Sequence, residues 1–445
     1  MKRRILLKTI AIFNSGLILS PVVKALSVKK LIKKLDFPLQ RKDFSKKFKW
    51  GVGIAAFQNE GATSIEGRTP SIWDSFTKGK NNIRNNQNAD TATNFYFNYR
   101  EDISLLKKMN FDNFRFSLSW LRILPDGVGK LNQQGVDFYH RLIDTCLKNR
   151  IRPWVTLYHW DLPQILEDKG GGTNRDITSW FGEYVDKATT TFGDKVKDWI
   201  VLNEPMGFTG FGYMLGYHAP GKKGTRNFLP AAHHAALCQS LGGRIARENV
   251  KNANVGTTFS CSHVEPLNDE DLNVKAAEKL DAILNRFYLE PLLGKGYPFG
   301  SIPGLEKIQK PFHDGDEQAL VFDFDFVGIQ YYFRTVGKFS LFPPILFATE
   351  VPASKRNVSV NAMDLEVYPK GLYKVLTKFH GYKNLPPMII AENGVCYPDE
   401  LINNRVNDIE RILYFKETIQ YIHKAIREGI DVRGFFAWTL TDNFE

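Results

Sequence analysis

The sequence predicts an α/β protein, a single-domain (β/α)8 TIM barrel, because strand-like and helix-like segments alternate along the chain. Eight short, nearly continuous apolar runs end in polar residues, and they occupy residues 48–58, 113–120, 152–160, 198–204, 255–264, 325–332, 387–392 and 432–439. Amphipathic segments separate these runs, and the clearest are 94–109, 135–149, 178–192, 229–248, 274–284 and 409–428. Such apolar runs are typical of parallel strands that are buried on both faces. Eight strand–helix units in succession indicate a closed barrel.

The end of the chain departs from that plan. Glu445 follows shortly after the eighth apolar run, so no amphipathic segment remains to cover the last strand. We therefore expect a barrel that lacks its last helix, at a cost to stability. The length of 445 residues alone would suit two or three domains, but barrels of this class often exceed that prior as one domain.

The composition is that of an ordinary soluble globular protein, with 43% hydrophobic and 24% charged residues. The net charge is +11, and part of the excess lies in a basic lead segment, residues 26–47. Nucleic acid or anionic lipid would attract such a segment, but a solvated linker is the commoner case, and we expect no nucleic-acid partner. The four cysteines are widely spaced and include no CxxC pair, which favours buried thiols over disulfides or a metal site. The sequence does not indicate the oligomeric state.

Residues 1–25 have the features of a signal peptide. Lys2, Arg3 and Arg4 form a positive start, residues 5–20 are mostly apolar, and residues 23–25 resemble a cleavage site. The paired arginines also resemble a twin-arginine signal. An uncleaved anchor is the alternative, but polar residues interrupt the apolar run too early for a confident span. The sequence predicts an exported protein, periplasmic or secreted, with no stable membrane span after cleavage and a barrel domain over residues 48–445.

Polar and aromatic residues stand at the ends of several predicted strands. They are Gln58, Arg115, His159, Asn203, Glu204, Tyr332, Glu392, Asn393 and Trp438. In (β/α)8 barrels, active sites lie at the C-terminal ends of the strands. We therefore expect these side chains to meet in one site.

Two of these residues, Glu204 and Glu392, form a candidate catalytic pair. Glycoside cleavage needs one carboxylic acid to protonate the leaving oxygen and one carboxylate to attack or to activate water. A separation of about 5–5.5 Å between the carboxyl groups gives retention, and about 6.5–9.5 Å gives inversion, a distance that sequence does not supply. Either glutamate alone is equally well interpreted as a salt-bridged residue at a strand end. Two such residues, each beside an asparagine, favour the catalytic interpretation.

Longer motifs surround these residues. Asn203-Glu204-Pro205 ends the fourth predicted strand and Glu392-Asn393-Gly394 the seventh, and other distinctive segments are 48–51, 58–61, 115–120, 158–163 and 434–445. In this order the motifs resemble glycoside hydrolase family 1, the family of β-glucosidases and β-galactosidases. The resemblance runs from residue 48 to the end, about nine-tenths of the chain.

The resemblance implies a role for each residue of the expected site. Glu204 would be the general acid/base and Glu392 the nucleophile of a retaining β-glycosidase. Arg115 and Tyr332 would keep Glu392 ionised, because a cation and a hydroxyl donor both favour a carboxylate. The residues implied to bind the sugar are Gln58, His159, Asn203, Trp438 and Glu445. No metal or organic cofactor is implied.

Several positions depart from the pattern of the family. Gln330 stands where an asparagine commonly precedes the Tyr-Tyr pair, and we expect it to alter contacts beyond the first sugar. Ala391 and Val201 replace threonines, so a hydroxyl is missing beside the nucleophile. Gly172 stands where a tryptophan often follows two glycines. None of these changes removes a reacting group.

The first hypothesis is therefore hydrolysis of β-linked glucosides, with galactosides and fucosides as further candidates. Glu445 would repel a phosphate, which favours unphosphorylated sugars. The first alternative is a catalytically inactive, sugar-binding barrel protein, although relatives of that kind usually lose one of the two glutamates. The second alternative is a transglycosidase, which would use the same residues but pass the sugar to another sugar instead of water.

Overall fold

A computed structural model describes residues 37–342 and 346–445, so the predicted signal peptide and the first half of the basic lead lie outside the described residues. Eight parallel strands form a closed ring in the order β1-β2-β3-β4-β5-β6-β8-β11, and β11 pairs with β1 to close it. The ring strands are β1 (Lys49–Gly53), β2 (Asn113–Ser117), β3 (Arg152–Tyr158), β4 (Asp198–Asn203), β5 (Asn254–Pro266), β6 (Phe326–Phe339), β8 (Met388–Asn393) and β11 (Val432–Trp438). The predicted (β/α)8 barrel is confirmed.

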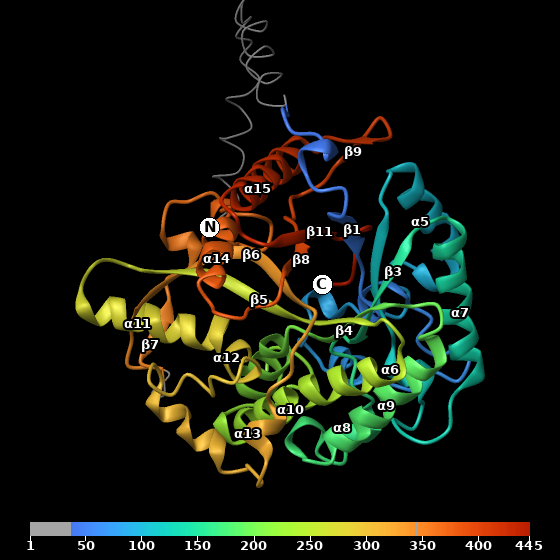
Figure 1. Ribbon diagram of the computed structural model, residues 1–445, viewed down its shortest axis with the longest axis horizontal. Helices are drawn as coiled ribbons and strands as arrows, with labels where there is room; N and C mark the ends of the chain where they lie inside the picture. Colours follow the sequence, from blue (N-terminus) through green and yellow to red (C-terminus); the bar gives the residue numbers. More distant parts are fainter. Residues whose placement is uncertain (1–36, 343–345) are drawn as a thin grey trace, which may run out of the picture.

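Helices surround the strands, which lie at the centre of the molecule (Figure 1). One long helix follows each of the first seven barrel strands, in the order α5 (Phe95–Lys108), α7 (Gln133–Lys148), α9 (Ile177–Phe192), α10 (Thr225–Asn249), α11 (Asp271–Asp281), α14 (Lys370–His380) and α15 (Ile409–Arg427). Residues 439–445, which follow β11, form no helix. No helix in the described part of the chain is both long and apolar enough to cross a membrane.

Shorter elements occupy the loops. They include α3 (Ala56–Asn59), α4 (Ile72–Thr77), α6 (Trp120–Ile123), α8 (Gln164–Glu167), the π-helix η4 (Gly207–Leu215), α12 (Leu289–Leu292), α13 (Asp316–Ala319), β7 (Ala348–Glu350), β9 (Leu401–Ile402) and β10 (Arg405–Val406). The expectation that the first strand continues to residue 58 is wrong, because the chain leaves β1 at Gly53 and Gln58 lies on α3. The helix α14 was not among the segments expected from sequence, although Leu372, Val375, Leu376 and Phe379 give it helical spacing and are buried.

Aromatic and aliphatic side chains fill part of the barrel interior. The cluster consists of Trp154, Ile200, Phe326, Ile389 and Phe436, from five different strands. Glycines on neighbouring strands make room for its rings. A Cβ atom on Gly51 would lie 2.4 Å from the Phe436 ring, and one on Gly256 would lie 2.4 Å from the Phe326 ring. This apolar cluster occupies part of the barrel interior, and polar side chains such as those of Asn203 and Glu392 lie at the C-terminal ends of their strands.

The described part of the basic lead packs against the barrel. Phe44 is buried, with its ring centroid 5.0 Å from those of Phe48 and Trp50. On its other side the Phe44 ring approaches His423 of α15 at 5.4 Å. The last part of the lead therefore contributes to the core outside β1.

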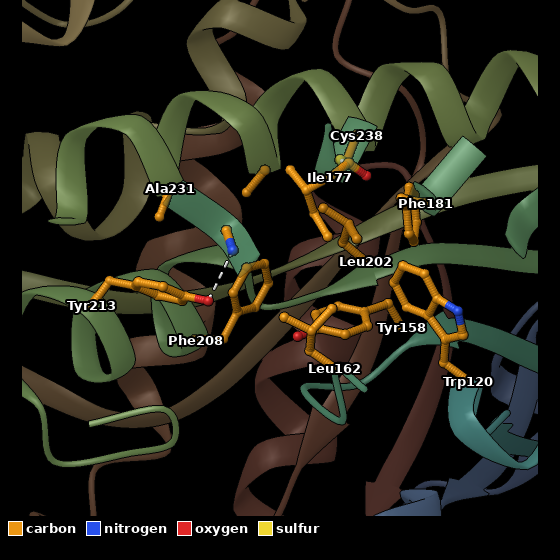
Figure 2. Close-up of a pocket in the computed structure, with 12 residues that line it drawn as sticks. Trp120, Tyr158, Leu162, Ile177, Phe181, Leu202, Phe208, Tyr213, Ala231 and Cys238 are labelled. Carbon is orange, nitrogen blue, oxygen red and sulfur yellow. Dashed lines mark hydrogen bonds between the residues drawn. The ribbon is translucent and has the colours of Figure 1, made fainter. Parts of the chain in front are cut away.

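An apolar cavity of about 40 Å³ lies behind β4, between α9, α10 and η4 (Figure 2). Gly172, the departure from the family's tryptophan, is one of its lining residues. A Cβ atom at Gly172 would stand 3.0 Å from the Tyr213 ring, whose hydroxyl accepts a hydrogen bond from the Gly172 amide at 3.0 Å. Tyr213 thus occupies the space that a side chain at residue 172 would need, and the cavity remains beside it.

Filling this cavity should stabilise the protein. Cys238 of α10 lines it, and valine has a similar helix propensity to cysteine, so Cys238→Val adds apolar volume with little change in propensity. At about 24 cal/mol per Å³ of cavity, we expect the free energy of unfolding to rise by about 1 kcal/mol, measured by chemical denaturation. Cys146→Val on α7 is the matched control, because Cys146 is fully buried but does not line the cavity. Equal effects of the two substitutions would contradict the prediction.

Candidate active site

The two glutamates expected from sequence lie at the C-terminal ends of their strands. Glu392 is on β8, and Glu204 follows directly after β4. Both are buried, at 3% and 8% exposure respectively. Glu204 adopts a φ of 44°, a left-handed conformation that is uncommon outside glycine. This bend ends β4, although the Glu204 amide still donates to the carbonyl of Thr258 on β5 at 3.0 Å.

Arg115 and Tyr332 both contact Glu392, as expected. Arg115 Nη1 donates to Glu392 Oε1 at 2.5 Å, and the Tyr332 hydroxyl donates to Oε2 at 2.7 Å. Arg115 is 1% exposed and uses its other donors on Thr156 Oγ1 (3.2 Å) and the carbonyl of Ala391 (3.0 Å). A buried ion pair is tolerated only when the remaining donors are satisfied, and this one meets that requirement.

These contacts oppose the cost of burying the charge of Glu392. Burial raises the pKa of Glu392, while the charge of Arg115 and then the hydrogen bond from Tyr332 lower it. The pKa stays above the ordinary value for a glutamate, and the two contacts limit that rise because they stabilise the carboxylate. Such a carboxylate is suited to nucleophilic attack.

Glu204 has no comparable cation on it. Burial and then the negative charge of Glu392 raise the pKa of Glu204 to about 8. A hydrogen bond from Ser260 and the more distant Arg115 only partly offset this rise. The two carboxyl groups thus lie in different environments, with a cation and a hydroxyl donor on Glu392 and burial beside a like charge at Glu204, and such a difference distinguishes a base from an acid within one site.

Asn203 and His159 contact each other in the same site. Asn203 is fully buried, and its Nδ2 lies 3.0 Å from His159 Nε2. His159 is 6% exposed, and burial followed by the charge of Arg115 lowers its pKa well below the ordinary value. His159 is therefore neutral, and its Nδ1 has no hydrogen-bond partner among the described residues.

The remaining three predicted sugar ligands gather at the same mouth. Trp438, at the end of β11, packs nearly parallel to the His159 ring, with centroids 5.7 Å apart. Gln58 Nε2 donates to the carbonyl of Phe444 at 3.1 Å. Glu445 is exposed as a residue, but its carboxyl group lies near Glu392, and burial of that group and the nearby charge raise its pKa to about 7. The nine residues to which the resemblance gave a role therefore belong to one region, whereas the Nδ2 group of Asn393 donates to the carbonyl of Tyr331 and to the hydroxyl of Tyr414 on α15.

Sequence reasoning did not assign a role at the first sugar to Gln330. The expectation placed its effect beyond that sugar, but Gln330 Nε2 donates to Asn203 Oδ1 at 2.6 Å. Thr258 Oγ1 also donates to this atom, at 3.2 Å. The sequence did hold one signal. Gln330 and Tyr332 are two residues apart on β6, and side chains with that spacing on a strand face the same side.

Metal ligation is not a feature of the described ranges, where no group of three His, Cys, Asp or Glu side chains could hold an ion. His233 and His234, the adjacent histidines of α10, instead have structural contacts. His233 Nε2 lies 2.9 Å from Asp316, and His234 Nδ1 lies 2.9 Å from the carbonyl of Gly172. Carboxyl groups, amides and aromatic rings are what this site offers.

Known proteins share both this sequence and this fold. The family profile described as glycosyl hydrolase family 1 matches residues 40–445. Beta-glucosidase A of Thermotoga maritima is 36% identical over 91% of this chain and 90% of its own length, and beta-glucosidase A of Acetivibrio thermocellus is 36% identical over 90% of each. A solved Thermotoga maritima family 1 glycoside hydrolase, complexed with a cyclophellitol analogue transition state mimic, has a TM-score of 0.87 and 36% identity, covering 90% of both chains. The chain therefore belongs to glycosyl hydrolase family 1 and is a glycosidase.

Proposed function

We propose that the protein is a retaining β-glucosidase in which Glu392 is the nucleophile and Glu204 the general acid/base. One observation carries the assignment of roles: Arg115 and Tyr332 both donate to Glu392, whereas the charge of Glu392 raises the pKa of Glu204. The relatives named as β-glucosidases support glucose as the sugar.

In the first step, the carboxylate of Glu392 attacks the anomeric carbon as the bond to the leaving oxygen breaks. Glu204, protonated at rest, gives its proton to that oxygen, so the aglycone leaves as an alcohol. Arg115 and Tyr332 lie on the attacking carboxylate and keep its charge available before the step. The product is a covalent ester between the sugar and Glu392.

In the second step, water replaces the enzyme at the anomeric carbon. The ester on Glu392 carries no charge, so the pKa of Glu204 falls and Glu204 takes a proton from the water. Attack from the same face that the aglycone left releases the sugar with its original configuration and restores the Glu392 carboxylate. The proton then resides on Glu204 for the next cycle.

The residues around the pair would bind the sugar itself. Hydrogen-bonding groups suited to its hydroxyls are those of Gln58, His159, Asn203 and Glu445, and the indole of Trp438 offers a flat apolar face to its C–H bonds. Asn203 adjoins Glu204 and would bind the 2-hydroxyl, whose hydrogen bonds strengthen in the transition state. A sugar without hydroxyls at these positions would leave buried polar groups unpaired.

The two alternatives differ in what they ask of the same residues. An inactive sugar-binding barrel needs neither glutamate, yet both are present and buried, and Arg115 contacts Glu392. A transglycosidase would share the first step and differ in the acceptor of the second. We favour hydrolysis because the named relatives are glucosidases and glucohydrolases.

We also propose that the chain is exported, with residues 1–25 as its signal. The support is the positive start, the apolar run and the small-residue site in the sequence. Expression of the full chain in a bacterial host should give a mature product near residue 26 outside the cytoplasm, measured by intact mass after fractionation. Arg3→Lys with Arg4→Lys should block this route if it is of the twin-arginine type. A full-length product that stays in the cytoplasm of the wild type would contradict export.

The covalent step can be tested by trapping. Incubation with an aryl 2-deoxy-2-fluoro-β-glucoside should add one sugar to the protein, mapped to the peptide that contains Glu392, because the fluorine slows the second step. The measurement is intact mass followed by peptide mapping. Glu392→Gln should give no adduct. A folded wild-type protein that forms no adduct with the glucoside or the galactoside analogue would favour the inactive barrel.

The two limbs of the pH profile should report the two glutamates separately. The rate constant kcat/KM should fall as pH rises through about 8, because Glu204 must be protonated in the free enzyme. Tyr332→Phe removes a donor from Glu392 and therefore raises its pKa. Since Glu392 must be ionised, the acidic limb should move to higher pH while the basic limb stays in place.

Tyr331→Phe is the control for that shift. Tyr331 precedes Tyr332 but faces away from the site, and its hydroxyl donates to the carbonyl of Tyr368 at 2.7 Å. This variant should leave both limbs where they are. An acidic limb that moves equally in the two variants, or in neither, would argue against Tyr332 as the support of the nucleophile.

A further inference from the structure

Gln330 lies between the two halves of the catalytic site. It is fully buried on β6, where it stands opposite Ser260 of β5 and Glu392 of β8 in the strand register. Its Nε2 donates to Asn203 Oδ1 at 2.6 Å. Its amide also favours the ionised form of Glu392, so it lowers the pKa of that carboxyl group. One side-chain amide thus links the nucleophile to the asparagine that precedes the acid/base.

The contacts of Asn203 fix which way its own amide points. Its Oδ1 receives hydrogen bonds from Arg115 Nη2 (2.5 Å), Gln330 Nε2 (2.6 Å) and Thr258 Oγ1 (3.2 Å). Guanidinium and amide nitrogens only donate, so the atom that faces them must be the oxygen. The Nδ2 group therefore points the other way, toward His159, and a flipped amide would meet two donors.

That orientation also fixes the tautomer of His159. Asn203 Nδ2 is a donor without a lone pair, and it lies 3.0 Å from His159 Nε2. His159 is neutral, so Nε2 must accept and the proton must be on Nδ1. Buried and without a protein partner, Nδ1–H is left as a donor.

The three donors to Asn203 Oδ1 differ in whether their contact depends on the charge of Glu392, which changes during the reaction. Arg115 is shared with Glu392, and that partner loses its charge when the sugar ester forms. Thr258 Oγ1 is the more distant donor, and it also lies 3.3 Å from the carbonyl of Leu202. Gln330 is uncharged, so its hold on Asn203 does not depend on the charge of the nucleophile.

We propose that Gln330 is a positioning residue that locks the Asn203 amide with Nδ2 toward His159, which selects the Nδ1–H form of His159 and leaves the second Nδ2 hydrogen for the sugar. Resting on the proposed function, this assigns Gln330 to recognition of the 2-hydroxyl at the first sugar. The glutamine side chain has one methylene more than the asparagine of the family pattern, and it is this side chain that contacts Asn203. Its effect runs through Asn203, so it should depend on the hydroxyl that Asn203 binds.

The test compares two substrates in one variant. Gln330→Met keeps the length of the side chain but removes the donor. We expect kcat/KM for an aryl β-glucoside to fall by about tenfold or more. For the aryl 2-deoxy-β-glucoside the fall should be much smaller, because that substrate loses only the support that the Gln330 amide gives to the ionised form of Glu392. The ratio of kcat/KM for the glucoside to kcat/KM for the 2-deoxy-glucoside should therefore fall well below that of the wild type. An unchanged ratio would overturn the proposal, whatever the absolute loss of activity.

Gln239→Met is the matched control. Gln239 is equally buried, on α10, and accepts a hydrogen bond from Thr257 Oγ1 at 3.1 Å outside the barrel mouth. Its replacement should lower stability without changing the substrate ratio. Gln330→Leu also lacks a donor and takes the place of Gln330→Met if that variant does not fold. A control that collapses the ratio as Gln330→Met does would overturn the assignment to Asn203.

A second measurement does not need activity. Nitrogen-15 spectra of histidine-labelled protein distinguish the two neutral tautomers, and His159→Gln identifies the signal among the nine histidines. Wild type should show His159 as the Nδ1–H form, and Gln330→Met should show a mixture. An Nε2–H form in wild type, or an unchanged pure Nδ1–H form in the variant, would overturn the proposal. Wild type that hydrolyses neither substrate but shows these spectra would refute the proposed function and leave the lock intact.

Discussion

The buried ion pair between Arg115 and Glu392 is the interaction on which the rest of the site depends. Taking both charges out of water costs several kcal/mol for each ion unless every donor finds a partner. Arg115 meets that condition through Thr156 of β3, the carbonyl of Ala391 on β8 and Asn203 of β4. The guanidinium therefore does more than balance a charge, because it fixes the positions of side chains across half the ring. A lysine could not make these contacts, since it lacks the planar fork of donors.

One guanidinium does not neutralise three carboxyl groups. Glu204, Glu392 and Glu445 share the mouth, and Glu392 alone is paired with Arg115. Burial and then the charge of Glu392 raise the pKa of Glu204 to about 8 and that of Glu445 to about 7, so at neutral pH Glu204 is mostly protonated and Glu445 is close to half protonated. The net charge of +11 for the whole chain has no counterpart here, since its basic groups are not gathered at the site. Local geometry, and not total charge, determines where the exchangeable proton resides.

The sequence was informative where a single rule governed a residue. Barrel strands expose their C-terminal ends, so polar residues such as Glu204 and Glu392 at those ends indicated the site. The sequence was less informative where contacts with residues distant in sequence determine the length of an element or the role of a residue. The strand β6 continues to residue 339 because β5 pairs with it beyond the barrel, and its polar residue Arg334 is held there by Glu366 at 2.6 Å. The contact of Gln330 with Asn203 likewise follows from the curvature of the ring, which brings β6 toward β4 and which no local pattern encodes.

Closure of the ring has a consequence for the synthesis of the protein. The parallel pairing of β1 with β11 places Gly51 opposite Phe436. The strand β1 is therefore synthesised long before β11, the second of the two strands that pair with it. Contacts between residues so distant in sequence form slowly, and until then β1 keeps an open edge that other chains can pair with. Trp438, which we propose to contact the sugar, lies on that last strand, so the proposed site is complete only when the ring closes. Nascent chains of this fold are therefore inert as catalysts, and they need protection from association during the time that closure takes.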